Sequence, residues 1–151
     1  MVSFCYDVHM PTEIDWSEYL LKKYKFWEIY LHDDQTYLGR CVIALNRDGN
    51  LDPFAETTVD ERQEFEVIMA DLQKVLKTLY QPDMFNYANL RNVWHHCHWH
   101  VIPRYKTTRE VLNQEFIDTN WGKNYTPRES LAIDQKVVMK IRDDLRLQLG
   151  Y

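Results

Sequence analysis

The sequence VWHHCHWHVIPRY, residues 93–105, decides the fold. Four of the six histidines of the chain fall within it, and three of them alternate with other residues: His96, His98 and His100. Successive side chains of a β-strand point to opposite faces, so these three imidazoles would share one face. The residues between them, Cys97 and Trp99, would then face the core. The pattern predicts a strand over residues 95–102, ended by Pro103, with one wet, functional face.

Three uses of this histidine row are open from the residues alone. The first is a set of solvated histidines on an exposed strand. The second is a transition-metal site, because neutral imidazole is the commonest metal ligand, although no carboxylate lies at a telling spacing nearby. The third is covalent catalysis, in which one histidine attacks the substrate and its neighbours handle the charge that develops.

Composition limits the class of protein. The 151 residues carry 18 basic and 23 acidic side chains, a formal net charge of -5. A chain of this length forms a core without disulfides or a structural metal, and its charge excludes coating of a nucleic-acid duplex. The three cysteines form no C-x-x-C pair. No signal peptide and no apolar stretch of membrane-spanning length is visible, so we expect a reduced, cytoplasmic protein that does not enter a membrane.

Outside the histidine row, the apolar pattern predicts helices and strands that alternate irregularly. The expected strands lie at residues 26–31, 41–45 and 84–92, and the expected helices at 12–24, 59–80 and 126–149. Thr58 and Glu61 form a capping box at the start of the long helix, and Pro82 follows its end. A second capping box opens the last helix at Thr126, and Gly150 closes it. Hairpins interleaved with helices favour an α+β fold with an antiparallel sheet.

The histidine row carries a family resemblance. Residues 96–102, HCHWHVI, resemble the H-φ-H-φ-H-φ-φ signature of the histidine-triad (HIT) superfamily of nucleotide hydrolases and transferases. Residues 37–42, YLGRCV, and the segment from Asn86 to Asn92 resemble bacterial HIT proteins related to diadenosine polyphosphate hydrolases. The resemblance covers residues from about 25 to 105 and implies a homodimer with an antiparallel sheet, a long helix and a C-terminal helix. Residues 1–151 would form a single HIT-like domain, with a C-terminal helical extension from about residue 106.

The resemblance also implies a mechanism and a set of site residues. His98 would attack the α-phosphorus of a nucleotide and carry the nucleoside monophosphate as a phosphoramidate until water releases it. His96 would orient His98 and the phosphate, and His100 would donate to phosphate oxygens. Three further residues are expected to contact the substrate: Asp34 near the ribose, and Asn89 and Asn92 near the phosphate or the leaving group. The remaining histidines, His9, His32 and His95, are interpreted as surface, structural or interface residues.

The predicted substrate is a purine nucleotide, either a dinucleoside polyphosphate or a nucleoside phosphoramidate. No metal or other cofactor is required for the covalent step, although a divalent cation bound to a polyphosphate substrate is compatible with it. A nucleotide-binding regulatory module with little turnover is the alternative function, and a metal-binding protein is a weaker one. Two residues depart from the family pattern: Asp48 stands where many members carry a histidine, and Arg91 lies in a loop that usually contains glycine. Arg91 or Arg104 would supply a cation for phosphate.

Overall fold

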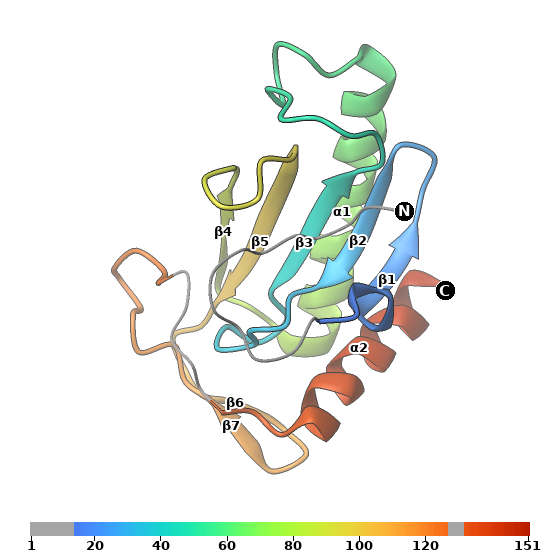
Figure 1. Ribbon diagram of the computed structural model, residues 1–151. Coiled ribbons are helices and arrows are strands. Elements are labelled where there is room, and N and C mark those ends of the chain that lie inside the picture. Colours follow the sequence, from blue (N-terminus) through green and yellow to red (C-terminus); the bar gives the residue numbers. More distant parts are fainter. Residues whose placement is uncertain (1–13, 127–131) are drawn as a thin grey trace.

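The computed structural model describes residues 14–126 and 132–151 and has an α+β architecture (Figure 1). Five antiparallel strands form a sheet in the order β1-β2-β3-β5-β4. The strands are β1 Leu20–Lys23, β2 Trp27–Leu31, β3 Cys41–Leu45, β4 Met84–Ala88 and β5 His98–Arg104. Helix α1, Val59–Tyr80, lies along one face of this sheet, and helix α2, Gln135–Leu149, packs beside α1 and β1. The predicted antiparallel α+β fold is confirmed.

Helix α1 begins and ends where the sequence predicts. The hydroxyl of Thr58 accepts a hydrogen bond from the Glu61 amide, and the Glu61 carboxylate accepts one from the Thr58 amide, so the capping box is complete. The helix ends at Tyr80, after which Gln81 adopts a left-handed conformation with φ 51°. Pro82 then prevents the helix from continuing.

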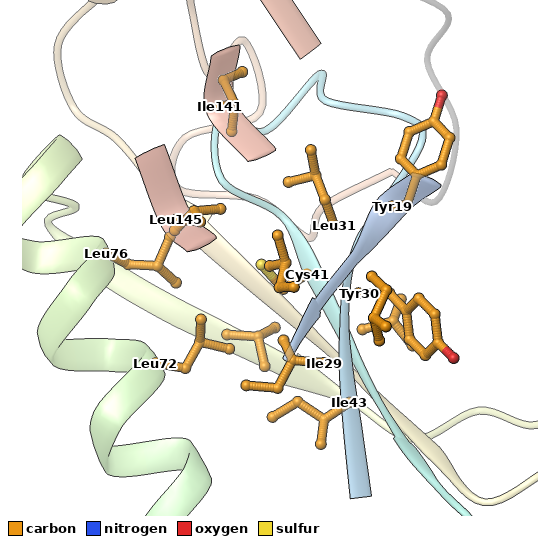
Figure 2. Close-up of a cluster of buried hydrophobic side chains, with 14 of the residues drawn as sticks. Tyr19, Ile29, Tyr30, Leu31, Cys41, Ile43, Leu72, Leu76, Ile141 and Leu145 are labelled. Carbon is orange, nitrogen blue, oxygen red and sulfur yellow. The ribbon is translucent and has the colours of Figure 1, made fainter. Parts of the chain in front are cut away.

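The core lies between the sheet and the two helices. Strands β2 and β3 pair as predicted, with Ile29 opposite Ile43. Figure 2 shows Leu72 and Leu76 of α1 pointing toward the sheet, while Tyr30 points from β2 to the other side of the sheet. The α1 face is therefore the apolar face, and the alternation within each strand sends the intervening side chains to the opposite face.

The predicted N-terminal helix over residues 12–24 is wrong for the described residues. A four-residue 3-10 helix, Trp16–Tyr19, is capped by the Asp15 side chain, and the chain then enters β1. Leu20 and Leu21 are both buried because β1 pairs with β2 at the edge of the sheet, with an irregularity between Leu20 and Lys22. Sheet pairing and burial therefore override the helical spacing. Residues 12 and 13 lie outside the described part.

The two strands around the histidine row are shorter or shifted relative to the prediction. Strand β4 ends at Ala88, and β5 begins only at His98. Strand β5 also continues through Pro103 to Arg104, so the prediction that proline ends it is wrong. Pairing with β3 stops at Val101, and only β4 accompanies the last residues of β5. A proline is tolerated there because its missing amide is required by one neighbour at most.

The C-terminal region contains an element that sequence reasoning missed. Strands β6, Arg109–Val111, and β7, Gln114–Phe116, form a hairpin whose two turn residues, Leu112 and Asn113, both have positive φ. The sequence predicts that the last helix opens at Thr126; residues 127–131 lie outside the described part, and α2 begins only at Gln135, with Asp134 as its N-cap, so the predicted helix is wrong for residues 132–134. Helix α2 ends at Gly150, as predicted. No helix within the described residues is long and apolar enough to cross a membrane.

Candidate active site

The histidine row lies on the face of the sheet opposite α1. In β5, His98 and His100 flank Trp99, whose ring lies 5.6 Å from that of Phe65 in α1. Trp99 is therefore on the α1 face, and the two histidines point the other way. The sheet register places His98 opposite Ala44 and His100 opposite Val42 in β3. The prediction that alternate histidines share a face holds for His98 and His100, whereas His96 lies before the strand and is placed by the preceding loop.

A backbone hydrogen bond fixes the tautomer of His98. Its Nδ1 lies 2.9 Å from the carbonyl oxygen of His96. A carbonyl only accepts, so Nδ1 carries the proton and Nε2 presents its lone pair. The carbonyl of His98 itself accepts a 2.7 Å hydrogen bond from the Asn89 side-chain amide. The carbonyl of His96 thus orients the imidazole, and the bond from Asn89 holds the backbone of His98 itself.

His96 is held in the opposite tautomer. Its Nε2 lies 2.7 Å from the carbonyl oxygen of Leu45 at the end of β3, so Nε2 carries the proton. The Trp94 ring stacks on His96 with centroids 4.4 Å apart and tilts against His98 at 4.6 Å. Both imidazoles are buried. The prediction of a wet face is therefore wrong, because Trp94 and the neighbouring backbone remove these two rings from water.

His100 continues the row and meets a histidine that sequence analysis left outside the site. Its ring lies 5.0 Å from His98, nearly perpendicular, and 5.5 Å from the buried His32 that follows β2. Within the described residues, Nδ1 of His100 is buried and has no hydrogen-bond partner. Strand alternation could have identified His32, because it follows Tyr30 by two residues and therefore lies on the same face. In the structure Tyr30 pairs with Val42, and Val42 pairs with His100.

Burial keeps these imidazoles uncharged. It lowers the pKa of His98 to about 4 and that of His100 to about 2, and the charges of neighbouring histidines act in the same direction. Burial also lowers the pKa of His96 and of His32; Arg40 adds to the effect on His32, and Asp33 opposes it. At pH 7 the row therefore consists of neutral rings, each of which can offer a lone pair or an N–H group.

The predicted substrate-binding residues lie around this row with different partners. Asp34 accepts a hydrogen bond from the Thr36 amide, and its other oxygen lies 3.5 Å from the buried Arg40. The Asn89 side chain binds the His98 carbonyl, and Asn92 is exposed in the loop before β5.

Arg91 and Arg104, the two cations predicted to bind phosphate, have different surroundings. The Arg104 guanidinium is buried and holds both oxygens of Asp118, at 2.6 and 3.1 Å, and the side chain of Asn86. It also donates to the carbonyls of Asn120 and Lys123. These bonds occupy the Arg104 guanidinium. The prediction that Arg104 supplies a cation for phosphate is therefore wrong. Arg91 remains near the row, in contact with the loop that precedes α1.

A metal site is the other use of a histidine row. Across residues 14–126 and 132–151, no group of three or more His, Cys, Asp or Glu side chains is arranged to hold a metal ion. The hydrogen bond from Nε2 of His96 to Leu45 directs that nitrogen to the backbone. The exposed Asp48 interacts electrostatically with His96 and favours its protonated form, against the larger effect of burial.

Comparisons with known proteins identify a family and solved structures of the same fold. The HIT domain family model matches residues 29–107. Among solved structures, a histidine triad protein from Marinobacter aquaeolei superposes with a TM-score of 0.70 at 17% identity, covering 89% of this chain and 92% of that one. A histidine triad protein from Bradyrhizobium japonicum gives a TM-score of 0.64 at 18% identity, covering 92% and 97%. A hypothetical histidine triad nucleotide-binding protein from Sulfolobus tokodaii gives 0.62 at 14% identity, covering 87% and 83%. No curated protein sequence matches the chain.

Proposed function

This chain belongs to the HIT family, and from that premise we propose that it is a nucleotide hydrolase or nucleotidyltransferase that uses His98 as its nucleophile. The family generally comprises nucleotide hydrolases and transferases, with some non-catalytic members. The observation that carries the proposal is the hydrogen bond from Nδ1 of His98 to the His96 carbonyl. This hydrogen bond places the proton on Nδ1 and leaves a lone pair on Nε2, in a ring that burial keeps neutral.

The covalent step balances around this lone pair. Nε2 of His98 forms a bond to the α-phosphorus, and the bond from phosphorus to the leaving oxygen or nitrogen breaks, with its electron pair passing to the leaving group. The ring then carries a positive charge while Nδ1 keeps its proton, and the His96 carbonyl, 2.9 Å away, stabilises that charge. Water next attacks the phosphorus, the N–P bond breaks, and neutral His98 is regenerated together with a nucleoside monophosphate and a released proton.

The neighbouring groups are assigned to the phosphate and the nucleoside. His100 offers a ring nitrogen that has no partner among the described residues, and we assign it as a hydrogen-bond donor to a phosphate oxygen. A buried, preorganised donor of this kind stabilises charge that develops in the transition state. His96 positions His98, Asp34 is assigned to the ribose, and Asn89 and Asn92 to the leaving-group side. The substrate is a dinucleoside polyphosphate or a nucleoside phosphoramidate of a purine.

The decisive experiment follows turnover of diadenosine tetraphosphate and of adenosine 5′-phosphoramidate. We expect AMP from at least one of them with the wild type and a loss of roughly 10⁴-fold in kcat with His98→Asn, which keeps the size and polarity of the side chain. His95→Asn is the matched control, because His95 is the exposed neighbour outside the row and its loss should leave turnover within twofold. Equal rates for wild type and His98→Asn would refute the nucleophile.

The covalent intermediate gives a second readout. A reaction quenched at alkaline pH, which preserves a phosphoramidate, should show the intact protein with one added adenylyl group, absent from His98→Asn.

Other measurements test the remaining predictions. Nucleotide-induced thermal stabilisation without product would instead identify a binding module with little turnover. Activity that survives a chelator would support the prediction that no metal is required for the covalent step. Light scattering tests the predicted homodimer.

The pH dependence of the reaction is a further consequence. The imidazole of His98 is nucleophilic only when neutral, and its pKa lies near 4. The midpoint of the acid limb of kcat/KM should therefore lie well below 6.5, the pH at which an ordinary histidine titrates. An acid limb at pH 6.5 would contradict a buried, neutral nucleophile.

A further inference from the structure

Arg91 occupies a backbone conformation that an arginine seldom adopts. It lies in the loop between β4 and β5 with φ 52°, in the left-handed region that favours glycine. Such a conformation persists only where the surroundings impose it, and it often occurs at ligand-binding loops. The loop itself is tied to the site, because Asn89, two residues earlier, donates to the carbonyl of His98.

The side chain of Arg91 is only loosely held. Its guanidinium lies 3.4 Å from the carbonyl and the side-chain oxygen of Asn50 and 3.6 Å from a carboxylate oxygen of Asp52. These distances are long for hydrogen bonds, and the side chain is 25% exposed. The other oxygen of Asp52 already accepts from the amides of Phe54 and Ala55. A phosphate could therefore replace Asp52 as the partner of this guanidinium at little cost in free energy.

The loop that carries Arg91 lies at the His98 end of the row, because Asn89 of the same loop donates to the His98 carbonyl over 2.7 Å. Burial is the main cause of the lowered pKa of His98 and of His100; the charge of Arg91 adds to the effect on His98, and the charge of Arg40 adds to the effect on His100. Arg91 therefore lies toward the His98 end of the row and Arg40 toward the His100 end. Arg40 is buried, so Arg91 is the more accessible of these two guanidiniums.

We propose that Arg91 binds the phosphate chain of the leaving group and thereby makes the protein select polyphosphate substrates over phosphoramidates. This inference rests on the proposed function of the His98 site. A guanidinium binds phosphate oxygens in a bidentate, charge-assisted manner. A leaving polyphosphate gains that interaction, whereas a leaving amine carries no negative charge and gains nothing from it.

A purely structural role for Arg91 makes a different prediction. If Arg91 only joins its loop to the loop at Asn50 and Asp52, then breaking the ion pair from either side would have the same effect. If Arg91 binds phosphate, removing Arg91 and removing its competitor would have opposite effects. Asp52→Asn is suited to this comparison, because the amide oxygen still accepts from Phe54 and Ala55 while the negative charge is lost.

The test measures the affinities of AMP and ATP by calorimetry for wild type, Arg91→Gly and Asp52→Asn. Glycine suits the left-handed backbone at this position, so Arg91→Gly should fold. We expect the ATP-to-AMP affinity ratio to fall about tenfold or more in Arg91→Gly, since one charge-assisted contact is lost. In Asp52→Asn the ratio should hold or rise, and in Arg91→Lys it should be partly restored.

A kinetic comparison extends the test to the reaction. Arg91→Gly should lower kcat/KM for diadenosine tetraphosphate by the same factor, with a change of less than about threefold for the phosphoramidate. An unchanged ATP-to-AMP ratio, or equal losses in Arg91→Gly and Asp52→Asn, would overturn the proposal while the His98 mechanism stands. A wild type that binds neither nucleotide would overturn both.

Discussion

The two faces of the sheet are built from the same strands and are stabilised in different ways. On the α1 face, Trp99 packs against Phe65 and the apolar residues of β2 and β3 are covered by helices. On the opposite face, β5 presents His98 and His100, which are sequestered as neutral rings. Hydrophobic burial needs no particular partner, whereas the orientation of the His98 imidazole depends on one backbone carbonyl, that of His96. The first face should therefore govern stability, and the second should govern chemistry and acid sensitivity.

The largest effect on stability is expected on the α1 face. Leu76 is fully buried in the core, so Leu76→Ala removes apolar contacts and leaves a cavity. The free energy of unfolding should fall by about 3 kcal/mol, measured by urea denaturation. Leu147→Ala is the control, because Leu147 is 76% exposed on α2 and its truncation should change stability by less than about 0.5 kcal/mol. A loss of turnover per folded molecule in Leu76→Ala would contradict the separation of the two faces.

The histidine face should make the protein sensitive to acid. Unfolded His98 binds a proton near pH 6.5, whereas folded His98 does so only near pH 4. Between these values the unfolded state binds more protons, so stability falls as the pH is lowered. The contribution of His98 is fully present above pH 6.5, and roughly 2 kcal/mol of it should be lost at pH 5.

The comparison that tests this dependence uses His98→Gln, which has no group that titrates in this range. The loss of unfolding free energy between pH 7 and pH 5 should be smaller in His98→Gln than in the wild type by that amount. His100 and His32 also have lowered pKa values, so the variant should keep part of the dependence. Identical pH dependence in the two proteins would show that folding leaves the pKa of His98 unchanged, and so would contradict a lowered pKa.

Local signals in the sequence were sufficient for much of the α1 face. The capping box at Thr58, the apolar spacing of α1 and the paired runs of β2 and β3 each act within a few residues, and the structure agrees with all of them. The N-terminal helix failed because the pairing of Leu20 and Lys22 with β2 depends on residues farther along the chain. Propensity is a weak guide where tertiary contacts decide.

The histidine face was only partly predictable. The alternation of His98 and His100 within β5 is a local property, and it led to both residues. The stacking of Trp94 arises from the irregular loop that directly precedes β5, and the approach of His32 arises from a strand that is distant in sequence. The same applies to Arg104, which pairs with Asp118 fourteen residues later and is thereby occupied. Spacing identifies which residues share a face, and long-range packing determines their environment.

A substitution at Gly39 should disturb both faces and so tests how well they are separated. Gly39 has φ 78°, and an added Cβ would lie 2.7 Å from a methyl of Leu76 in α1. Its amide also binds Gln35, whose side chain holds the carbonyls of His32 and Arg40. Gly39→Ala should lower the unfolding free energy by roughly 2 kcal/mol and also reduce turnover.

The matched control for Gly39 is the C-cap of α2. Gly150 has a similar φ of 71°, but an added Cβ there meets no atom within 4 Å. Gly150→Ala should therefore lower the free energy by about 1 kcal/mol, from backbone strain alone, and leave turnover unchanged. Equal losses of stability in the two variants would show that Leu76 yields freely and that the close approach at Gly39 has no energetic consequence.

The smallest effect is expected where the capping box starts α1. Thr58→Ala removes the hydroxyl that accepts from the Glu61 amide, while the Glu61 carboxylate keeps Arg47 and the Thr58 amide as partners. The unfolding free energy should fall by about 1 kcal/mol, measured by urea denaturation, and Thr58→Ser should recover most of it because the hydroxyl returns. Turnover should stay within twofold in both variants, since the cap acts on the helix and the histidines depend on Leu45 and Trp94. A fall in turnover that exceeds the fall in folded protein would mean that the start of α1 positions the histidine row through Arg47, and the two faces would then be coupled at this end of the sheet.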